Sequence, residues 1–363
     1  MREKVKSFAD LITEVQIKGL CHRCGGCVTF CSAINYGALE LGEGNRPHFK
    51  DPEKCIECGL CYVICPEITE LEAETKKMVG WNAPMGRVLK VSSARAVDPQ
   101  LRKRATDGGV VTGLLLHLLE TNQIDGAIVS KKTGQFSRMP WLATSREEII
   151  EAAGTHFDES HGLQTIGEEY RTTFSSSVQA LRSTMERHLQ SVAVVGTPCQ
   201  IHSLRRMEAL KIVPSDIINY ELGLFCTKNF VFNKKMISQL EKIGGFKSED
   251  VDKINIKKDF LINLKDGRQV AIPVDKMDFM TRSACRYCTD YSAEYADISF
   301  GGIASPDGWT TAIMRTPLGR AIYFGAIGKT LEEYQGAIDV GEIYEASDNK
   351  KASAARFRNS IKK

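Results

Sequence analysis

Residues 21–31 read CHRCGGCVTFC, and residues 55–66 repeat the pattern as CIECGLCYVICP. Each run places its cysteines at relative positions 0, 3, 6 and 10, which is the spacing C-x2-C-x2-C-x3-C that wraps a chain around a cubane 4Fe-4S cluster. Glycines adjoin the cysteines in both runs. The two runs therefore predict an N-terminal bacterial-ferredoxin-like module with an internal repeat.

The spacing also predicts which cysteines bind together. In chains with two such runs, the fourth cysteine of each run binds the cluster held mainly by the other run. The first predicted set consists of Cys21, Cys24, Cys27 and Cys65. The second predicted set consists of Cys55, Cys58, Cys61 and Cys31. Disulfides or a zinc knuckle are the alternatives, but eight cysteines in two matched runs favour two 4Fe-4S clusters and an electron-transfer role.

The composition is that of an ordinary globular protein. Its 363 residues are 42% hydrophobic and carry a formal net charge of +3, so the chain is long enough for more than one domain and shows no sign of a nucleic-acid partner. The longest apolar run, residues 110–119, is too short to span a membrane. The N-terminal residues lack the apolar core of a signal peptide. We expect a cytoplasmic protein that could attach to a membrane complex only through partner subunits.

Four of the twelve cysteines lie outside the two runs: Cys199, Cys226, Cys285 and Cys288. Each lies at an expected strand end or in a loop. If those strand ends share one edge of a sheet, the four thiolates can hold a third 4Fe-4S cluster. Buried free thiols are the alternative use, and the C-x2-C pair could also form a redox dithiol or half a zinc site.

From residue 90 the pattern changes to alternating strands and helices, which predicts an α/β domain. Two glycine-rich turns, at residues 107–109 and 196–198, each precede an expected helix. Backbone N–H groups and the helix dipole favour phosphate at such turns. Neither turn has the G-x-G-x-x-G pattern, so a nicotinamide nucleotide is not indicated, and a plain strand-to-helix connection without a ligand is the alternative for each turn.

Five segments of the second domain resemble, in the same order, the family of beta subunits of coenzyme F420 hydrogenases and dehydrogenases. They read ATDGGVVTGLLLHLLETNQIDGAIV, VAVVGTPCQIHSLRRM, LGLFCTKN, CRYCTDYSAEYADISFGG and SPDGWTTAIMRT. The similarity spans about residues 88–324, and with the N-terminal module the chain resembles the electron-input subunits of F420H2 dehydrogenases. The resemblance implies a bound FAD, a site for coenzyme F420 (a 5-deazaflavin) and a 4Fe-4S cluster on the four later cysteines.

The resemblance also implies which residues bind the flavin and its substrate. They are Thr106, Asp107, Gly108, Gly109, Val110, Thr112, Gly196, Thr197, Pro198, Gln200, Lys228, Gly301 and Gly302. The family often has Ser-Gly-Gly where this chain has Asp107–Gly109. It often has Gly-Ser-Lys-Tyr where this chain has Gly154, Thr155, His156 and Phe157, so one lysine expected at the cofactor is absent.

The expected domains are a 2×(4Fe-4S) ferredoxin-like module (1–75), a linker (76–90), an FAD and coenzyme F420 domain with the third cluster (91–345) and a basic C-terminal tail (346–363). A deazaflavin transfers hydride, whereas iron–sulfur clusters accept single electrons, so a flavin between them is required. No side chain is expected to act as an acid–base catalyst.

The partner is expected to be another component of an electron-transfer complex or a soluble ferredoxin. A hydrogenase, a formate dehydrogenase, a heterodisulfide reductase and a membrane dehydrogenase are all compatible with the sequence. Three alternatives to the whole interpretation remain: a ferredoxin-dependent flavin and iron–sulfur reductase of the same family acting on a different substrate, a flavin-free electron relay, and a zinc-stabilised interaction module.

Overall fold

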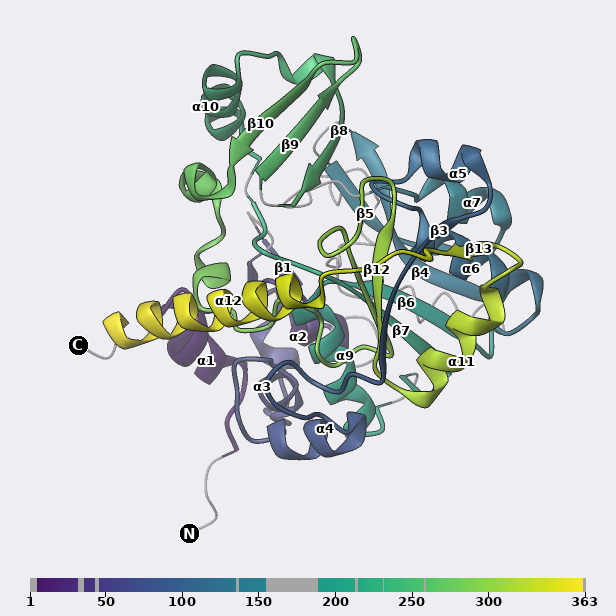
Figure 1. Cartoon of the computed structure of the whole chain (residues 1–363). Coiled ribbons are helices and arrows are strands. Elements are labelled where there is room, and N and C mark those ends of the chain that lie inside the picture. The colour runs from purple at the N-terminus through teal and green to yellow at the C-terminus, as the bar shows by residue number, and fades with distance from the viewer. Residues whose placement is uncertain are drawn as a thin grey trace.

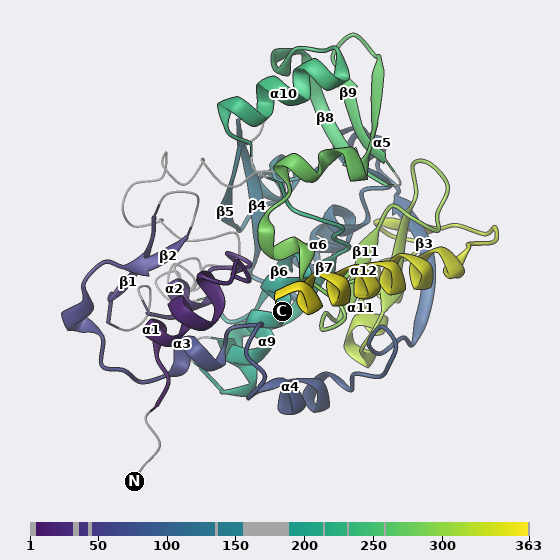
Figure 2. The same ribbon diagram turned by 90° about the vertical axis from the view of Figure 1, so that its left-hand side faces the viewer.

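The computed structural model describes residues 5–31, 36–42, 46–134, 137–154, 189–212, 215–230, 232–257 and 259–361. An eight-stranded sheet with flanking helices lies at the centre (Figure 1). The cysteine-rich module lies to one side of this sheet, and a small three-stranded sheet stands at the other end of the molecule (Figure 2). The fold is mixed α/β, as the alternating sequence pattern predicts.

The two cysteine runs share one backbone conformation. Each run passes through two residues with positive φ, which are Arg23 (52°) and Gly25 (85°) in the first and Glu57 (52°) and Gly59 (76°) in the second. Glycine adopts this conformation without strain, and a short helix begins directly after it in both runs. The module comprises α1 (Phe8–Leu11), η1 (Ile12–Gln16), α2 (Gly26–Val28), β1 (Leu39–Leu41), β2 (Pro47–Phe49), η4 (Pro52–Lys54), α3 (Leu60–Val63) and α4 (Glu72–Val79). The repeat in the sequence is thus a repeat in the backbone.

The large sheet has the strand order β13-β3-β12-β11-β7-β6-β4-β5. Its four central strands, β11, β7, β6 and β4, run parallel, and the strands at both margins pair antiparallel. The strands are β3 (Lys90–Ala96), β4 (Gly126–Gly134), β5 (Ser137–Ala143), β6 (Val192–Gly196), β7 (Ile218–Leu224), β11 (Ile298–Gly301), β12 (Thr310–Met314) and β13 (Leu331–Glu333). Because parallel strands end at the same edge, the turns after β6, β7 and β11 meet there.

Helices cover both faces of this sheet. Side chains alternate along a strand, so Ala193 of β6 packs in the core under α6, whereas Val192 and Val194 pack against α9. The helices of this domain are α5 (Pro99–Arg104), α6 (Val110–Glu120), α7 (Arg146–Glu151), α9 (Pro198–Ala209) and α11 (Pro317–Ala326), with η7 (Ser215–Ile217). Phe30 and Ile64 of the N-terminal module join the cluster under α9. The module therefore shares a hydrophobic core with the second domain.

The small sheet has the order β10-β9-β8 and its own hydrophobic core. The sheet consists of β8 (Val251–Ile256), β9 (Asp259–Leu264) and β10 (Gln269–Pro273). The helices of the same segment are α10 (Lys234–Gly244), η8 (Ser248–Asp250), η9 (Val274–Met280) and η10 (Ser283–Arg286). Strand β8 faces the large domain, because Lys253 Nζ donates a hydrogen bond of 3.0 Å to the carbonyl oxygen of Ala105.

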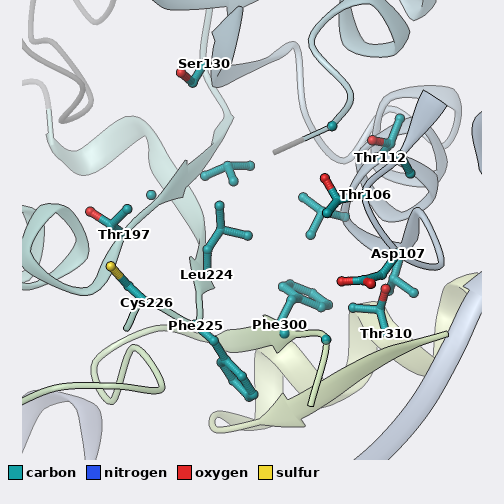
Figure 3. A pocket seen from close by; sticks show the side chains of 18 of the residues that line it. Thr106, Asp107, Thr112, Ser130, Thr197, Leu224, Phe225, Cys226, Phe300 and Thr310 are labelled. Carbon is teal, nitrogen blue, oxygen red and sulfur yellow. The ribbon is translucent and has the colours of Figure 1, made fainter. Parts of the chain in front are cut away.

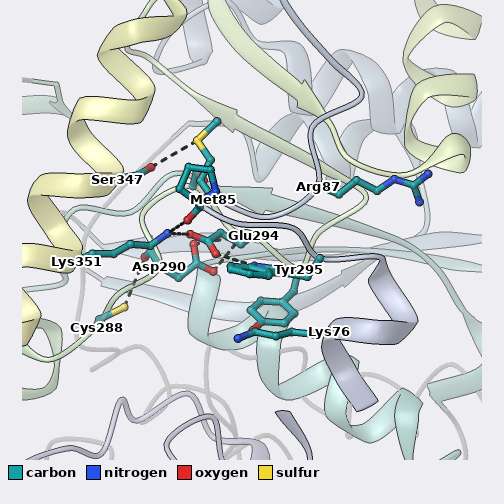
Figure 4. A network of polar contacts seen from close by, with 12 residues as sticks. Lys76, Met85, Arg87, Cys288, Asp290, Glu294, Tyr295, Ser347 and Lys351 are labelled. Carbon is teal, nitrogen blue, oxygen red and sulfur yellow. Dashed lines mark hydrogen bonds and ion pairs between the residues drawn. The ribbon is translucent and has the colours of Figure 1, made fainter. Parts of the chain in front are cut away.

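The C-terminal segment forms the helix α12 (Val340–Ile361), which crosses the expected domain boundary at residue 345. Its side chains contact the segment that links the two domains (Figure 4). Lys351 Nζ lies 2.7 Å from Glu294 Oε1 and also donates to the carbonyl oxygen of Pro84. Trp81 Nε1 donates to the same glutamate at 2.8 Å. The basic tail is thus a helix that packs on the linker, and the division into domains stays a prediction.

None of the helices in the described part of the chain is both long and apolar enough to cross a membrane.

Candidate functional site

A cavity of about 240 Å³ lies at the edge where the parallel strands end (Figure 3). Its walls come from the turn before α6, the turn between β6 and α9, and the segment after β7. Helices α6 and α9 both begin at this edge, so each presents the positive end of its dipole there. The arrangement suits a ligand with an apolar body and an anionic group.

Eleven of the thirteen residues predicted to bind the cofactor line this cavity. They are Thr106, Asp107, Gly109, Val110, Thr112, Gly196, Thr197, Gln200, Lys228, Gly301 and Gly302. Gly108 and Pro198 do not. The N–H of Gly108 donates to Thr310 Oγ1 at 2.9 Å, and an added side chain there would meet the carbonyl oxygen of Ala94 in β3. Pro198 is the buried first residue of α9.

Several residues that line the cavity were not identified from the sequence: Ser130, Phe225, Asn255, Tyr291, Phe300 and Thr310. Phe225 and Phe300 lie at the ends of β7 and β11, so the rule that ligands bind where parallel strands end could have found them. Asn255 lies in β8 of the small sheet, and no local pattern connects it with the two glycine-rich turns.

Asp107, in the turn before α6, contacts the small sheet. Asn255 Nδ2 donates to its Oδ1 at 2.9 Å, and Lys257 Nζ lies 3.7 Å from the same oxygen. Burial raises the pKa of Asp107 above its ordinary value, although Lys257 and Asn255 both favour the ionised form. The departure from the Ser-Gly-Gly pattern thus has a local role, because Asp107 binds Asn255 of the small sheet at the wall of the cavity. Gly154 lines the cavity too, whereas residues 155–157 lie outside the described residues.

The cysteines of the N-terminal runs line two separate small cavities. Cys21, Cys24, Cys27 and Cys65 line one of them. Cys31, Cys55, Cys58 and Cys61 line the other. All twelve cysteines of the chain are free thiols. The cavities therefore bring together the two sets that the exchange of the fourth cysteine predicts.

The four later cysteines also meet. Cys199 lies in the first turn of α9, Cys226 follows β7, and Cys285 and Cys288 lie in and after η10. Cys199, Cys285 and Cys288 all lie near Cys226, and burial raises the pKa of that thiol to about 12. A thiol of this kind is deprotonated at neutral pH only when it binds a metal.

A lysine from α12 completes this environment. Lys350 Nζ donates to the carbonyl oxygens of Cys226 and Thr227 at 2.5 and 3.0 Å. It also lies beside the thiols of Cys226, Cys285 and Cys288. A buried cation next to thiolates offsets their charge.

The large cavity and the three cysteine sets follow one another through neighbouring side chains. Cys226 lines the large cavity. His22 and Cys24 of the first run both lie near Cys199. Cys27 lies near Cys61 of the second run, and Cys58 is exposed. The order from inside to outside is therefore the cavity, the later cysteines, the first set and the second set.

Within the described residues, no three or more His, Cys, Asp or Glu side chains are arranged so as to hold a metal ion. The assignment of cysteines to clusters stays a prediction.

Fold and site together define a mixed α/β protein with an N-terminal iron–sulfur domain. Residues 14–66 match the family described as a 4Fe-4S dicluster domain. Residues 91–166 and 189–338 match the N-terminal and C-terminal parts of the coenzyme F420 hydrogenase/dehydrogenase beta subunit. The chain belongs to this family of beta subunits, as its five sequence segments predict.

Individual relatives agree with this assignment. The beta subunit of coenzyme F420 hydrogenase from Methanococcus voltae is 33% identical over 245 residues, which are 66% of this chain and 81% of the relative. A component of the F420H2 dehydrogenase from Methanosarcina mazei is 27% identical, and the alignment covers 97% of this chain and 95% of the relative. In the solved structure of the F420-reducing NiFe hydrogenase complex from Methanosarcina barkeri, one chain superposes with a TM-score of 0.67 at 26% identity. That superposition covers 77% of this chain and 94% of the other.

Proposed function

We propose that this chain is the redox subunit of a larger oxidoreductase that exchanges hydride with coenzyme F420 and single electrons with a partner protein. FAD would occupy the cavity at the sheet edge, and three 4Fe-4S clusters would occupy the three cysteine sets. The flavin, when bound, supplies the chemistry that links two-electron to one-electron transfer.

The observation that carries this proposal is the position of Cys226, which lines the cavity and also belongs to the later cysteine set. With both groups bound, a residue shared by the two sites would put a two-electron cofactor next to a one-electron centre. The positive dipole ends of α6 and α9 would face the phosphates of FAD. Val110, Leu224 and Phe300 supply apolar walls for a ring system.

The order of the cysteine sets supports an electron path toward the surface. The contact between His22 and Cys199 joins the later set to the first N-terminal set, and the second set contains the exposed Cys58. A partner would receive or deliver electrons at that exposed end. The named relatives belong to a hydrogenase and an F420H2 dehydrogenase, so the partner is proposed to be the catalytic or membrane-bound part of such a complex.

The proposal is tested with anaerobically purified protein, reduced coenzyme F420 and a viologen dye as the one-electron acceptor. We expect FAD and iron to co-purify, and we expect the dye to be reduced only when the coenzyme is present. A preparation with iron but no flavin would contradict the proposal and support a flavin-free relay. A flavoprotein that reduces the dye from another donor but not from the coenzyme would support a reductase with a different substrate.

The cavity assignment makes a separate prediction about Gly301. The Phe225 ring lies so close to this glycine that an added Cβ would be 1.9 Å from Cδ2 of the ring. Gly301→Ala must therefore move Phe225, which lines the cavity. The free energy cost of such overpacking is about 1–3 kcal/mol. Because the displaced ring takes space from the ligand, we expect FAD binding to bear this cost and its Kd, measured by fluorescence titration, to rise roughly 5- to 150-fold.

Gly325→Ala is the matched control. An added Cβ at Gly325 would make only an ordinary contact of 3.4 Å with His117 in α6. FAD should bind to this variant as it does to the wild type. Equal Kd values for the Gly301→Ala variant and the wild type would show that the flavin does not bind in this cavity.

A further inference from the structure

Helix α9 brings a side chain of the second domain to the first N-terminal cysteine set. Cys199 and Ser203 are four residues apart, so they lie on the same face of the helix, one turn apart. Cys199 belongs to the later set, whereas Ser203 lines the cavity formed by Cys21, Cys24, Cys27 and Cys65. One helix face therefore touches the sites of two predicted clusters.

The hydroxyl group of Ser203 lacks a partner among the described residues. The side chain is 1% exposed, and its Oγ makes no hydrogen bond there. A buried hydroxyl without a partner costs about 1–3 kcal/mol, so an acceptor in the adjoining cavity would explain why a polar residue stands at this position. The sulfur atoms of a cluster are such acceptors.

The packing around Ser203 keeps the hydroxyl in place. Helix α2 approaches α9 through Gly26, and a Cβ on that glycine would overlap with Ser203 Oγ and lie 3.4 Å from Met207 Cε. The neighbouring Arg206 donates to the carbonyl oxygen of Cys65 at 2.8 Å. The module and α9 are thus held together on both sides of the serine.

We propose that the Ser203 hydroxyl donates a hydrogen bond to a sulfur of the cluster bound by Cys21, Cys24, Cys27 and Cys65, and thereby raises the reduction potential of that cluster. The inference rests on the proposed function, because it requires a 4Fe-4S cluster in this cavity. A reduced cluster carries more negative charge than an oxidised one, so a hydrogen bond to its sulfur stabilises the reduced form more. Ser203 would then be a positioning and tuning residue supplied by the flavin domain to the ferredoxin-like module.

The test is a redox titration of Ser203→Ala, followed by electron paramagnetic resonance. We expect unchanged iron content and one N-terminal cluster that is harder to reduce. At a fixed potential its ratio of oxidised to reduced form should rise about tenfold, which corresponds to about 59 mV for one electron. In ordinary buffer, the spin of the wild-type cluster should couple to a proton whose signal is lost after exchange into deuterated buffer, and this exchangeable coupling should be absent from the variant.

Thr29→Val is the matched control. Thr29 is 0% exposed and its Oγ1 has no partner among the described residues, but it lines neither N-terminal cysteine cavity. Its removal should leave both N-terminal potentials unchanged. An equal shift in both variants, loss of iron from Ser203→Ala, or wild-type potentials in Ser203→Ala would each overturn the assignment.

These outcomes are separate from those of the proposed function. If the wild-type protein contains no cluster on the first set, the proposed function itself fails for the N-terminal module. If it contains that cluster but Ser203→Ala behaves as the wild type, the role of Ser203 alone is wrong.

Discussion

Replacing Cys199 with serine is expected to remove about one third of the iron, because one of three 4Fe-4S clusters loses a ligand. Cys199 lies in the first turn of α9 and is a neighbour of Cys226. The two N-terminal sets involve other residues, so their signals in electron paramagnetic resonance should persist. Iron and acid-labile sulfide analysis measures the loss. Unchanged iron content in this variant would refute a third cluster on the later cysteines.

The same substitution should interrupt electron flow between the two halves of the chain. The cavity should still bind FAD, and reduced coenzyme should still bleach the flavin absorbance. Reduction of the N-terminal clusters by the coenzyme should be lost, because Cys199 is the residue of the later set that contacts His22 and lies near Cys24. Stopped-flow absorbance separates the two steps.

Cys31→Ser provides the comparison. Cys31 lines one of the two small N-terminal cavities together with Cys55, Cys58 and Cys61. Replacing Cys31 should therefore affect a different cluster and leave the later set intact. If both variants lost the same signal, the separation of the cysteines into sets would be wrong.

Replacing Arg206 with methionine is expected to cost about 3–5 kcal/mol of stability, which is the usual effect of breaking a buried ion pair from one side. The Arg206 side chain is 0% exposed. Its guanidinium group donates to Glu72 Oε2 at 2.8 Å and to the carbonyl oxygens of Val63 and Cys65 at 3.1 and 2.8 Å. All three acceptors belong to the N-terminal segment, so the loss should loosen the contact between the two domains.

Glu72 explains much of this cost. Burial opposes its ionisation, but hydrogen bonds from His202, Tyr295 and Arg206 outweigh burial and hold its pKa well below the ordinary value. A carboxylate with a lowered pKa stabilises the fold at neutral pH, and this contribution is lost only as the pH falls through the folded-state pKa. Without Arg206, the Glu72 carboxylate stays charged at neutral pH and loses its only arginine partner among the described residues.

Chemical unfolding at pH 7, followed by circular dichroism, measures the effect. Arg102→Met is the matched control, because Arg102 also donates to two backbone carbonyl oxygens, those of Ala96 and Val97, and pairs with a glutamate, but it is 28% exposed and Glu332 is 42% exposed. A surface pair of this kind contributes at most about 1 kcal/mol. Equal losses in the two variants would show that Arg206 does not hold the domains together.

The sequence by itself determined the local chemistry of this protein. Cysteine spacing predicted two ligand sets, and these are the sets that line the two N-terminal cavities. Strand–turn–helix patterns predicted the turns before α6 and α9, and most of the residues expected there line the large cavity. These features depend on residues close together in the chain, whose geometry is fixed by backbone conformation and periodicity.

Only the tertiary structure decided how the sites are connected. In the folded chain His22 of the first run lies beside Cys199, and Asn255 of the small sheet donates to Asp107. Lys350 of the last helix binds the backbone at the later cysteines. The tertiary structure also aimed Ser203 of α9 into a cavity built by the N-terminal module. Each of these contacts joins residues far apart in sequence, so it depends on how whole helices and sheets pack, which no local pattern of residues encodes.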